Sequence, residues 1–234
     1  MQLDPANSPY TQSKFLNYLS DCQHNGEMTI PSLPLTSKLL GVSISSLREQ
    51  MEFARQMGFI EVKPKTGIKI LDYSFSPSVV RSASYAIQVD PMQFEKFADL
   101  RNHIEAAYWY NAVIRLTADD IRELKNLVDQ AFEKINRKPS QIPHNEHKNL
   151  HLLMYKRLGN AFVTGILDAY WVLYETVGLN YYTDQAYLNT VWQYHRQIVE
   201  AIERSEFQKG YQALLAHMDL ILNRKNKNNS TTFE

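Results

Sequence analysis

The sequence has few of the features of secreted and membrane proteins. One cysteine, Cys22, is present among the 234 residues, so no disulfide can form within the chain, as is typical of a reducing cytoplasm. The first ten residues are polar and include Asp4, whereas a secretion signal has basic and apolar regions. The longest apolar stretch, residues 166–174, contains Asp168 and is much shorter than the roughly 20 residues that span a bilayer. We therefore expect a soluble, cytoplasmic protein that makes no membrane contact.

An excess of charge of one sign is also missing. The 25 lysines and arginines balance the 25 aspartates and glutamates, so no overall field attracts nucleic acid. Any contact with DNA therefore requires a local patch, and residues 38–69 provide one, with six basic and three acidic residues. On charge alone, ordinary solvated lysines explain this excess as well as a DNA contact does.

Residues 1–76 show the pattern of a winged helix-turn-helix domain. Apolar residues at helical spacing predict three helices. Their predicted bounds are residues 11–22, 36–40 and 45–57. Ser46 and Glu49 have the spacing of a capping box at the start of the third helix, and Gly58 is typical of a helix end. Alternating apolar and polar residues then predict a hairpin, which would form the wing. The predicted hairpin strands are residues 59–62 and 68–70.

The rest of the chain is predicted to contain a linker, a helical domain and a tail. Residues 77–90 are rich in serine and weakly periodic, which favours a linker. Residues 91–223 are helical in pattern, with turn residues between segments. The predicted helices are residues 91–114, 118–135, 145–158, 161–176, 184–205 and 206–223. Residues 224–234 are polar and rich in asparagine, so we expect a disordered tail. The expected fold class is mostly α, with an N-terminal winged helix-turn-helix and a C-terminal all-α helical bundle.

The predicted DNA-binding residues lie at the helix starts and in the wing of the N-terminal domain. A helix-turn-helix places its second helix in the major groove, where residues near the N-terminus contact bases and phosphates. Serine hydroxyls and free amides at a helix start bind phosphate, and Arg48 can contact a phosphate or a guanine. Basic residues of the wing are suited to hold phosphates. The candidates are Ser32, Ser43, Ser45, Ser46, Arg48, Lys65, Thr66 and Gly67.

Four short motifs in this domain follow one another in a distinctive order and spacing. They are Ile30-Pro31-Ser32, Leu40-Gly41-Val42-Ser43, Leu47-Arg48-Glu49 and Gly58-Phe59-Ile60-Glu61. The set resembles the DNA-binding motif of the GntR family of transcription regulators. This resemblance implies a homodimer that binds a palindromic operator in double-stranded DNA. Pro34 and Ile44 stand where the family usually has arginine, which implies a different operator or weaker binding, whereas Arg48 matches.

Histidines gather in the predicted helical domain. Five of the seven lie between His144 and His217, and four of them share helix faces with apolar residues. These four are His147, His151, His195 and His217. An unpaired imidazole in an apolar interior costs on the order of 1–3 kcal/mol, and one shared divalent transition metal would satisfy all four. Alternatively, each is a hydrogen-bonded core residue.

Three histidine motifs resemble, in order, the metal-binding motifs of FCD sensor domains in the FadR subfamily. They are residues 147–151, 194–198 and 215–218, with His147 in place of the usual aspartate. The resemblance implies that His147, His151, His195 and His217 hold a metal, zinc or nickel first, and that a small organic acid is the effector. Four neutral imidazoles leave the full charge of the ion, which favours an anionic ligand. The candidate effector-binding residues are Arg101, Asn160 and Tyr155.

The sequence therefore predicts a DNA-binding transcription regulator, with no catalytic residues, whose operator affinity responds to a carboxylate at a histidine-bound metal. One alternative is a metal-free sensor for an acyl-CoA type of ligand. A second is a metal-dependent hydrolase. Lys148 argues against the hydrolase, because it occupies the position of the glutamate base in an HExxH helix. His103 and His144 lie outside the matched motifs and are not expected to be ligands.

Overall fold

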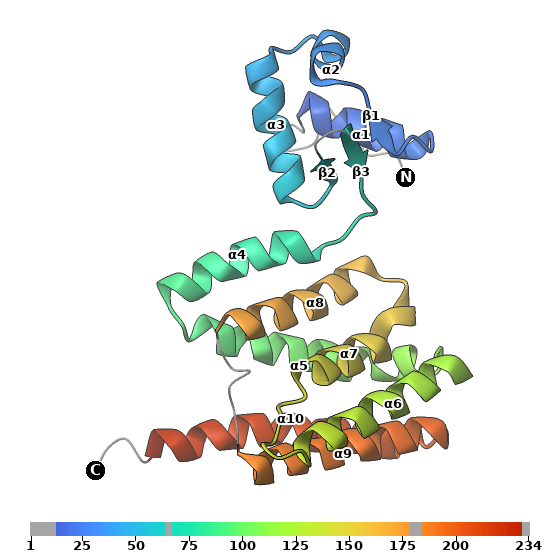
Figure 1. Cartoon of the computed structure of the whole chain (residues 1–234), viewed down its shortest axis with the longest axis vertical. Coiled ribbons are helices and arrows are strands. Elements are labelled where there is room, and N and C mark those ends of the chain that lie inside the picture. The colour runs from blue at the N-terminus through green and yellow to red at the C-terminus, as the bar shows by residue number, and fades with distance from the viewer. Residues whose placement is uncertain (1–12, 64–66, 178–183, 231–234) are drawn as a thin grey trace. The chain divides into compact units, whose positions relative to one another are not determined.

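A computed structural model describes residues 13–63, 67–177 and 184–230, the last ten of these by their backbone alone (Figure 1). The chain divides into two compact units between Ser78 and Val79. None of the helices in the described ranges is both long and apolar enough to cross a membrane.

The N-terminal unit combines three helices with a small antiparallel sheet (Figure 1). Its elements are α1 (Lys14–His24), β1 (Thr29–Ile30), α2 (Leu33–Leu40), α3 (Ile44–Gln56), β2 (Ile60–Lys63) and β3 (Gly67–Ile70). The strand order is β1-β3-β2, with Ile60 opposite Ile70 and Val62 opposite Ile68. The core joins Phe15 of α1 to Leu47 of α3 and to the inward isoleucines of the sheet. These elements form the predicted winged helix-turn-helix.

Two helix starts in this unit differ from the predicted ones. The N-cap of α3 is Ser43, whose hydroxyl accepts a hydrogen bond from the Ser46 amide at 3.2 Å. The predicted capping box at Ser46 and Glu49 is therefore wrong, because Ser46 already lies inside the helix. Helix α2 begins before the predicted residue 36, since Pro34 fits in a first turn, where a helix needs no N–H donor.

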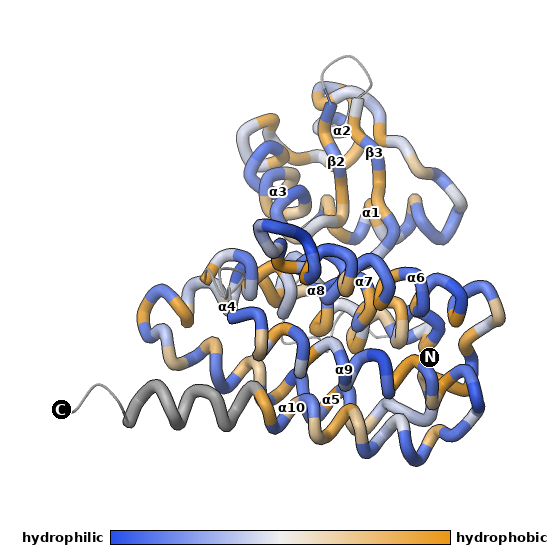
Figure 2. The backbone as a smooth tube through the Cα atoms, turned by 60° about the horizontal axis from the view of Figure 1, so that its bottom comes forward, coloured by the Kyte–Doolittle hydropathy of each residue, from blue (hydrophilic) through white to orange (hydrophobic). Residues whose placement is uncertain are grey.

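The C-terminal unit is a bundle of helices around one large core. Its helices are α4 (Ser76–Val89), α5 (Gln93–Val113), α6 (Ala118–Ile135), α7 (His144–Tyr155), a 3-10 turn (Lys156–Leu158), α8 (Ala161–Thr176), α9 (Gln185–Glu203) and α10 (Phe207–Ser230). Helix α9 lies between α6 and α10 and contacts both (Figure 1). Hydrophobic and hydrophilic residues alternate in short stretches along these helices, as expected where one face of each is buried (Figure 2). Six helices, α5 to α10, supply the core, which contains Trp109, Leu124, Leu150, Leu167, Trp192 and Leu214.

Two segments of this part of the chain are helical where the sequence predicted no helix. Helix α4 covers all but the last of residues 77–90, the predicted linker, and packs the partly buried Val80, Ala83 and Ile87 against Phe94 and its aromatic neighbours. The predicted tail at 224–234 is also too long, since α10 is helical as far as Ser230. No proline or glycine follows Gly210 in α10, so the sequence contains no strong helix terminator there. Residues 231–234 lie outside the described residues.

Candidate metal centre

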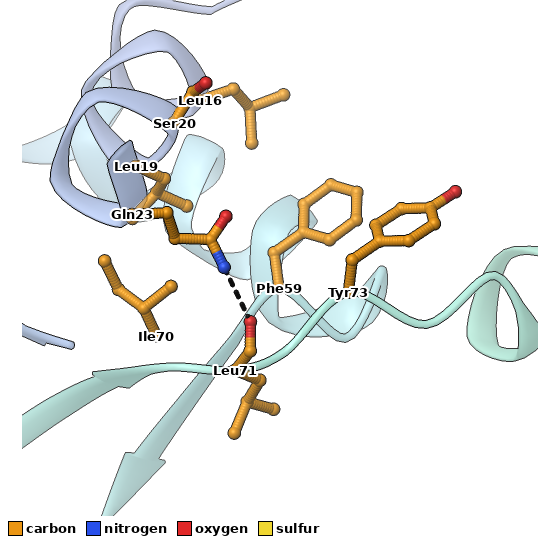
Figure 3. Close-up of a pocket in the computed structure, with 8 residues that line it drawn as sticks. All are labelled: Leu16, Leu19, Ser20, Gln23, Phe59, Ile70, Leu71 and Tyr73. Atoms are coloured by element: carbon orange, nitrogen blue, oxygen red, sulfur yellow. Dashed lines mark hydrogen bonds between the residues drawn. The ribbon is translucent and has the colours of Figure 1, made fainter. Parts of the chain in front are cut away.

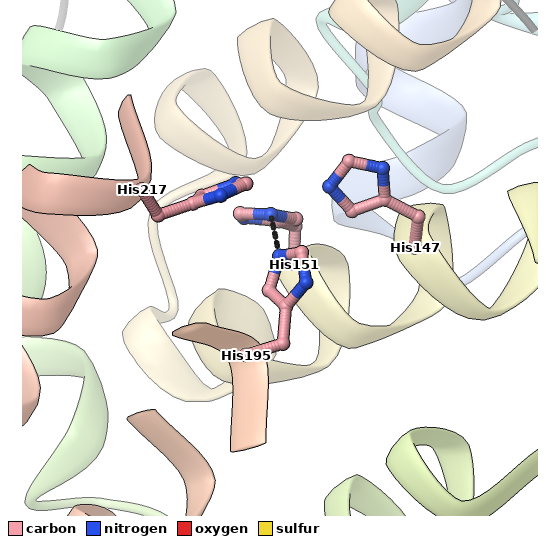
Figure 4. A group of neighbouring side chains, drawn as sticks. All are labelled: His147, His151, His195 and His217. Atoms are coloured by element: carbon pink, nitrogen blue, oxygen red, sulfur yellow. Dashed lines mark hydrogen bonds between the residues drawn. The ribbon is translucent and has the colours of Figure 1, made fainter. Parts of the chain in front are cut away.

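Four imidazoles from three helices meet inside the C-terminal unit (Figure 4). Helix α7 provides His147 and His151, which are four residues apart and therefore share a face. Helix α9 provides His195 and α10 provides His217. One ring nitrogen from each residue lies within 4.8 Å of the others. His151, His195 and His217 are fully buried, and His147 is partly exposed.

The ring nitrogens of this cluster are poorly satisfied by the protein itself. The Nε2 atoms of His151 and His195 face each other at 3.1 Å. Among the described residues, no hydrogen-bond partner reaches Nε2 of His147, Nδ1 of His195 or either nitrogen of His217. Leaving buried polar atoms unpaired is costly, whereas a cation at their meeting point would bind them all. The donor set therefore fits a divalent transition metal.

The cluster has the protonation state that metal binding requires. Burial lowers the pKa of all four imidazoles well below its usual value, and the positive charge of Arg101 lowers it further. Each ring is consequently neutral at pH 7 and has one nitrogen lone pair to offer. Protons do not have to be displaced before a metal binds at this pH.

Glu105 of α5 orients one of the four rings. Its Oε1 lies 3.1 Å from Nδ1 of His151, and Nη2 of Arg101 lies 2.9 Å from the same oxygen. Burial raises the pKa of Glu105 to about 7, and the adjacent Arg101 opposes this shift. When Nδ1–H of His151 donates to Glu105, Nε2 keeps its lone pair and faces the other rings. A carboxylate behind a ligating histidine commonly fixes its orientation in this way.

Replacing Glu105 by alanine is expected to weaken metal binding by about 10- to 100-fold, the usual effect of removing such a partner. Glu105→Gln is the matched control, because its amide oxygen can still accept from His151 and should preserve most of the affinity. A competition titration with a zinc-sensitive dye measures both variants. Equal affinity in wild type and Glu105→Ala would show that Glu105 does not support the site.

The predicted effector-binding residues have different surroundings. Arg101 is buried 4.8 Å from the ring centre of Tyr170, and its Nε has no partner among the described residues. Tyr155 is close by, but its hydroxyl donates to the Glu105 carbonyl at 2.9 Å. Asn160 is the N-cap of α8, where its side-chain oxygen accepts from two backbone amides. Of these three, Arg101 retains an unused donor beside the histidines.

Trp171 is a neighbour of the cluster that the sequence patterns did not assign to the site. Its ring centre lies 4.7 Å from that of His147 and 5.5 Å from that of His151. Its buried Nε1 has no hydrogen-bond partner among the described residues. Because α8 is apolar on several faces, Trp171 could not be distinguished from ordinary core by its spacing.

The structure gathers several predicted DNA-binding residues at the start of α3. Ser45 and Arg48 are exposed, and Ser43 caps the helix. The Ser46 hydroxyl already accepts a hydrogen bond from the side-chain amide of Gln50 at 3.1 Å. Ser32 precedes α2 and is exposed. These residues remain the candidates for DNA contact.

The predicted wing residues are only partly described. Gly67 opens β3 with a φ of 87°, a conformation that favours glycine. Lys65 and Thr66 lie outside the described residues. Lys63 is exposed and lies 3.0 Å from the carboxylate of Glu61 on the same strand.

A separate pocket of about 260 Å³ lies within the N-terminal unit, between α1 and the end of β3 (Figure 3). Leu16, Leu19, Phe59 and Ile70 form apolar walls, and Tyr73 closes one side. The single hydrogen bond drawn across it runs from Gln23 Nε2 to the Leu71 carbonyl at 3.0 Å. The described residues that line the pocket include no histidine, cysteine, aspartate or glutamate.

We compared the sequence with protein-family models and the structure with solved structures. The family model of the FCD domain matches residues 96–220, a segment that contains all four histidines and both Arg101 and Glu105. A structure described as Streptococcus agalactiae GntR has a TM-score of 0.67 and 18% identity, over 89% of this chain and 96% of its own.

A second structure, E. coli McbR/YncC, has a TM-score of 0.51 and 20% identity, over 93% of this chain and 99% of its own. No curated protein matches the sequence. At these identities the structural likeness concerns the fold, while the family match covers more than half of the chain. The chain belongs to the FCD domain family, and its fold is that of a GntR regulator.

Proposed function

We propose that this protein is a transcription regulator whose FCD domain senses a small carboxylate at a four-histidine metal centre and thereby changes its affinity for DNA. The observation that carries this proposal is the meeting of four neutral imidazoles, three of them fully buried, of which His147, His195 and His217 have ring nitrogens with no hydrogen-bond partner among the described residues. The family match supports a sensor domain at this position.

The proposed metal is a divalent transition ion, with zinc or nickel as the first candidates. Neutral imidazole is a good ligand for both. His147, His151, His195 and His217 would hold the ion. When bound, it would supply an electrophilic centre that attracts an anion.

The charge around the cluster favours an anionic effector. Four neutral imidazoles cancel none of the charge of a divalent ion. Arg101 is positively charged and lies 2.9 Å from Glu105, and its Nε has no partner among the described residues and can donate to an anion. The indole Nε1 of Trp171 is a second buried donor beside the histidines. A small carboxylate can bind the metal through one oxygen and accept from such donors.

The two alternative functions fit this site less well. An acyl-CoA type of ligand offers nothing that would satisfy the unpaired ring nitrogens of His147, His195 and His217. A hydrolase would need a general base next to the metal, but Lys148 follows His147 on α7 and lies 3.7 Å from Glu175. A regulator needs the bound ligand to change an equilibrium between conformations, and no chemical step.

DNA binding by the N-terminal unit is the other half of the proposal. Helix α3 is the second helix of a helix-turn-helix and would enter the major groove with its N-terminal end. Ser45 and Arg48 are exposed at that end. A homodimer would place two such helices on the half-sites of a palindrome.

Arg48→Ala is expected to weaken binding to DNA by roughly 1–3 kcal/mol, through loss of a base or phosphate contact. The DNA is first selected from a random duplex library with the full wild-type chain, and affinities are then measured by fluorescence anisotropy. Arg55→Ala is the matched control, because Arg55 lies near the other end of α3 and is paired with Glu52 at 2.6 Å. If the wild type selects no sequence, or if both variants bind like wild type, the proposed role of α3 is wrong.

A further inference from the structure

Ile44 is an exposed apolar residue at the first position of α3. Its side chain is 41% exposed and belongs to no core cluster of the N-terminal unit. Leu47, in the same turn, is fully buried, so α3 is anchored to the core without Ile44. Single exposed apolar residues are common on proteins, and exposure alone would not mark a site. The position of Ile44 is what distinguishes it.

The cap of α3 fixes where Ile44 lies. The Ser43 hydroxyl accepts from the Ser46 amide, so the helix starts sharply and Ile44 occupies its first turn. Ile44 and Arg48 are four residues apart and share one flank of the helix. Ser45 is exposed beside them. The end of α3 that would enter the groove therefore presents a branched apolar side chain followed by a guanidinium.

The chemistry of the major groove restricts what such an apolar side chain can recognise. Guanine, adenine and cytosine present hydrogen-bonding atoms there, whereas thymine also presents a C5-methyl group. Isoleucine can neither donate nor accept a hydrogen bond, and pressing it against polar base edges would remove water without replacement. A thymine methyl is the one standard group in that groove that isoleucine can bury favourably.

We propose that Ile44 is a specificity-determining residue that recognises the C5-methyl group of one thymine in each operator half-site, next to the base pair that Arg48 contacts. This inference rests on the proposed DNA-binding function. It specifies thymine as a base of the operator, which the proposed function does not specify.

Replacement of thymine by deoxyuridine tests the contact, because it removes the methyl group and leaves every hydrogen-bonding atom in place. The full chain is titrated against its selected operator with each thymine replaced in turn. We expect affinity to fall about 4-fold at one thymine in each half-site, the effect of exposing one buried methyl group, and about 15-fold when both are replaced. All other thymines should show smaller effects.

Variants of Ile44 connect the methyl effect to this residue. Ile44→Ser should bind the thymine and deoxyuridine operators equally, while Ile44→Val should keep part of the preference. Undisturbed folding is checked by circular dichroism. If no deoxyuridine replacement weakens wild-type binding, or if Ile44→Ser keeps the full preference, the inference is overturned while DNA binding stands. If the wild type selects no DNA at all, the inference and the proposed function both fail.

Discussion

The full chain with His151→Ala and His195→Ala together is expected to lose at least nine-tenths of its bound metal. These residues come from α7 and α9, and their Nε2 atoms face each other at 3.1 Å, so both changes remove ligands from the centre of the cluster. Metal that binds only the folded protein stabilises it by about 4 kcal/mol when its concentration is 1,000 times the dissociation constant. The double variant should lack this contribution to the free energy of unfolding. Elemental analysis of purified protein and thermal unfolding measure the two effects.

A chelator separates the loss of metal from the loss of packing. Chelation should lower the unfolding temperature of the wild type and leave that of the double variant nearly unchanged. The matched control is His24→Ala with His103→Ala, since both residues are exposed histidines whose Nδ1 contacts a backbone carbonyl of their own helix. Wild-type metal content in the cluster variant would refute the proposed ligand set.

Strongly periodic helices with capping residues were predicted well from the sequence. The predicted bounds of α6 and α8 are those of the structure, because Thr117 caps the first in a capping box and Asn160 caps the second. Helix α4 was missed, since serines interrupt its partly buried apolar face of Val80, Ala83 and Ile87. Strand β1 is two residues long, too short to show alternation.

The four histidines could be predicted as a group because apolar residues share their helix faces, and the structure brings their rings together. Their surroundings could not be predicted in the same way. Glu105 meets His151 across 46 positions of sequence, and this pairing depends on how α5 packs beside α7. Trp171 has the same pattern as a core residue. The spacing of residues along one helix suggests candidate ligands, whereas the neighbours that other helices supply can be named only once the fold is known.

His147→Asp is expected to weaken the binding of a small carboxylate by about 100-fold and to leave metal bound. An aspartate in this position would cancel one of the two charges of the ion, and two unit charges about 4 Å apart interact by about 4 kcal/mol at an effective dielectric constant of 20. Part of this energy is lost to screening and relaxation. Acetate is a suitable probe, and tryptophan fluorescence is the readout, because Trp171 lies 4.7 Å from His147 between ring centres.

The matched control for charge is His147→Asn, which has nearly the size of aspartate and can bind the metal through a neutral oxygen. If charge determines anion affinity, the asparagine variant should bind acetate within a few-fold of wild type, while the aspartate variant does not. Equal weakening in both variants would mean that the shape of the site at His147 matters more than its charge. His147 is the most accessible of the four proposed ligands, so this exchange also disturbs the core less than a change at His151, His195 or His217 would.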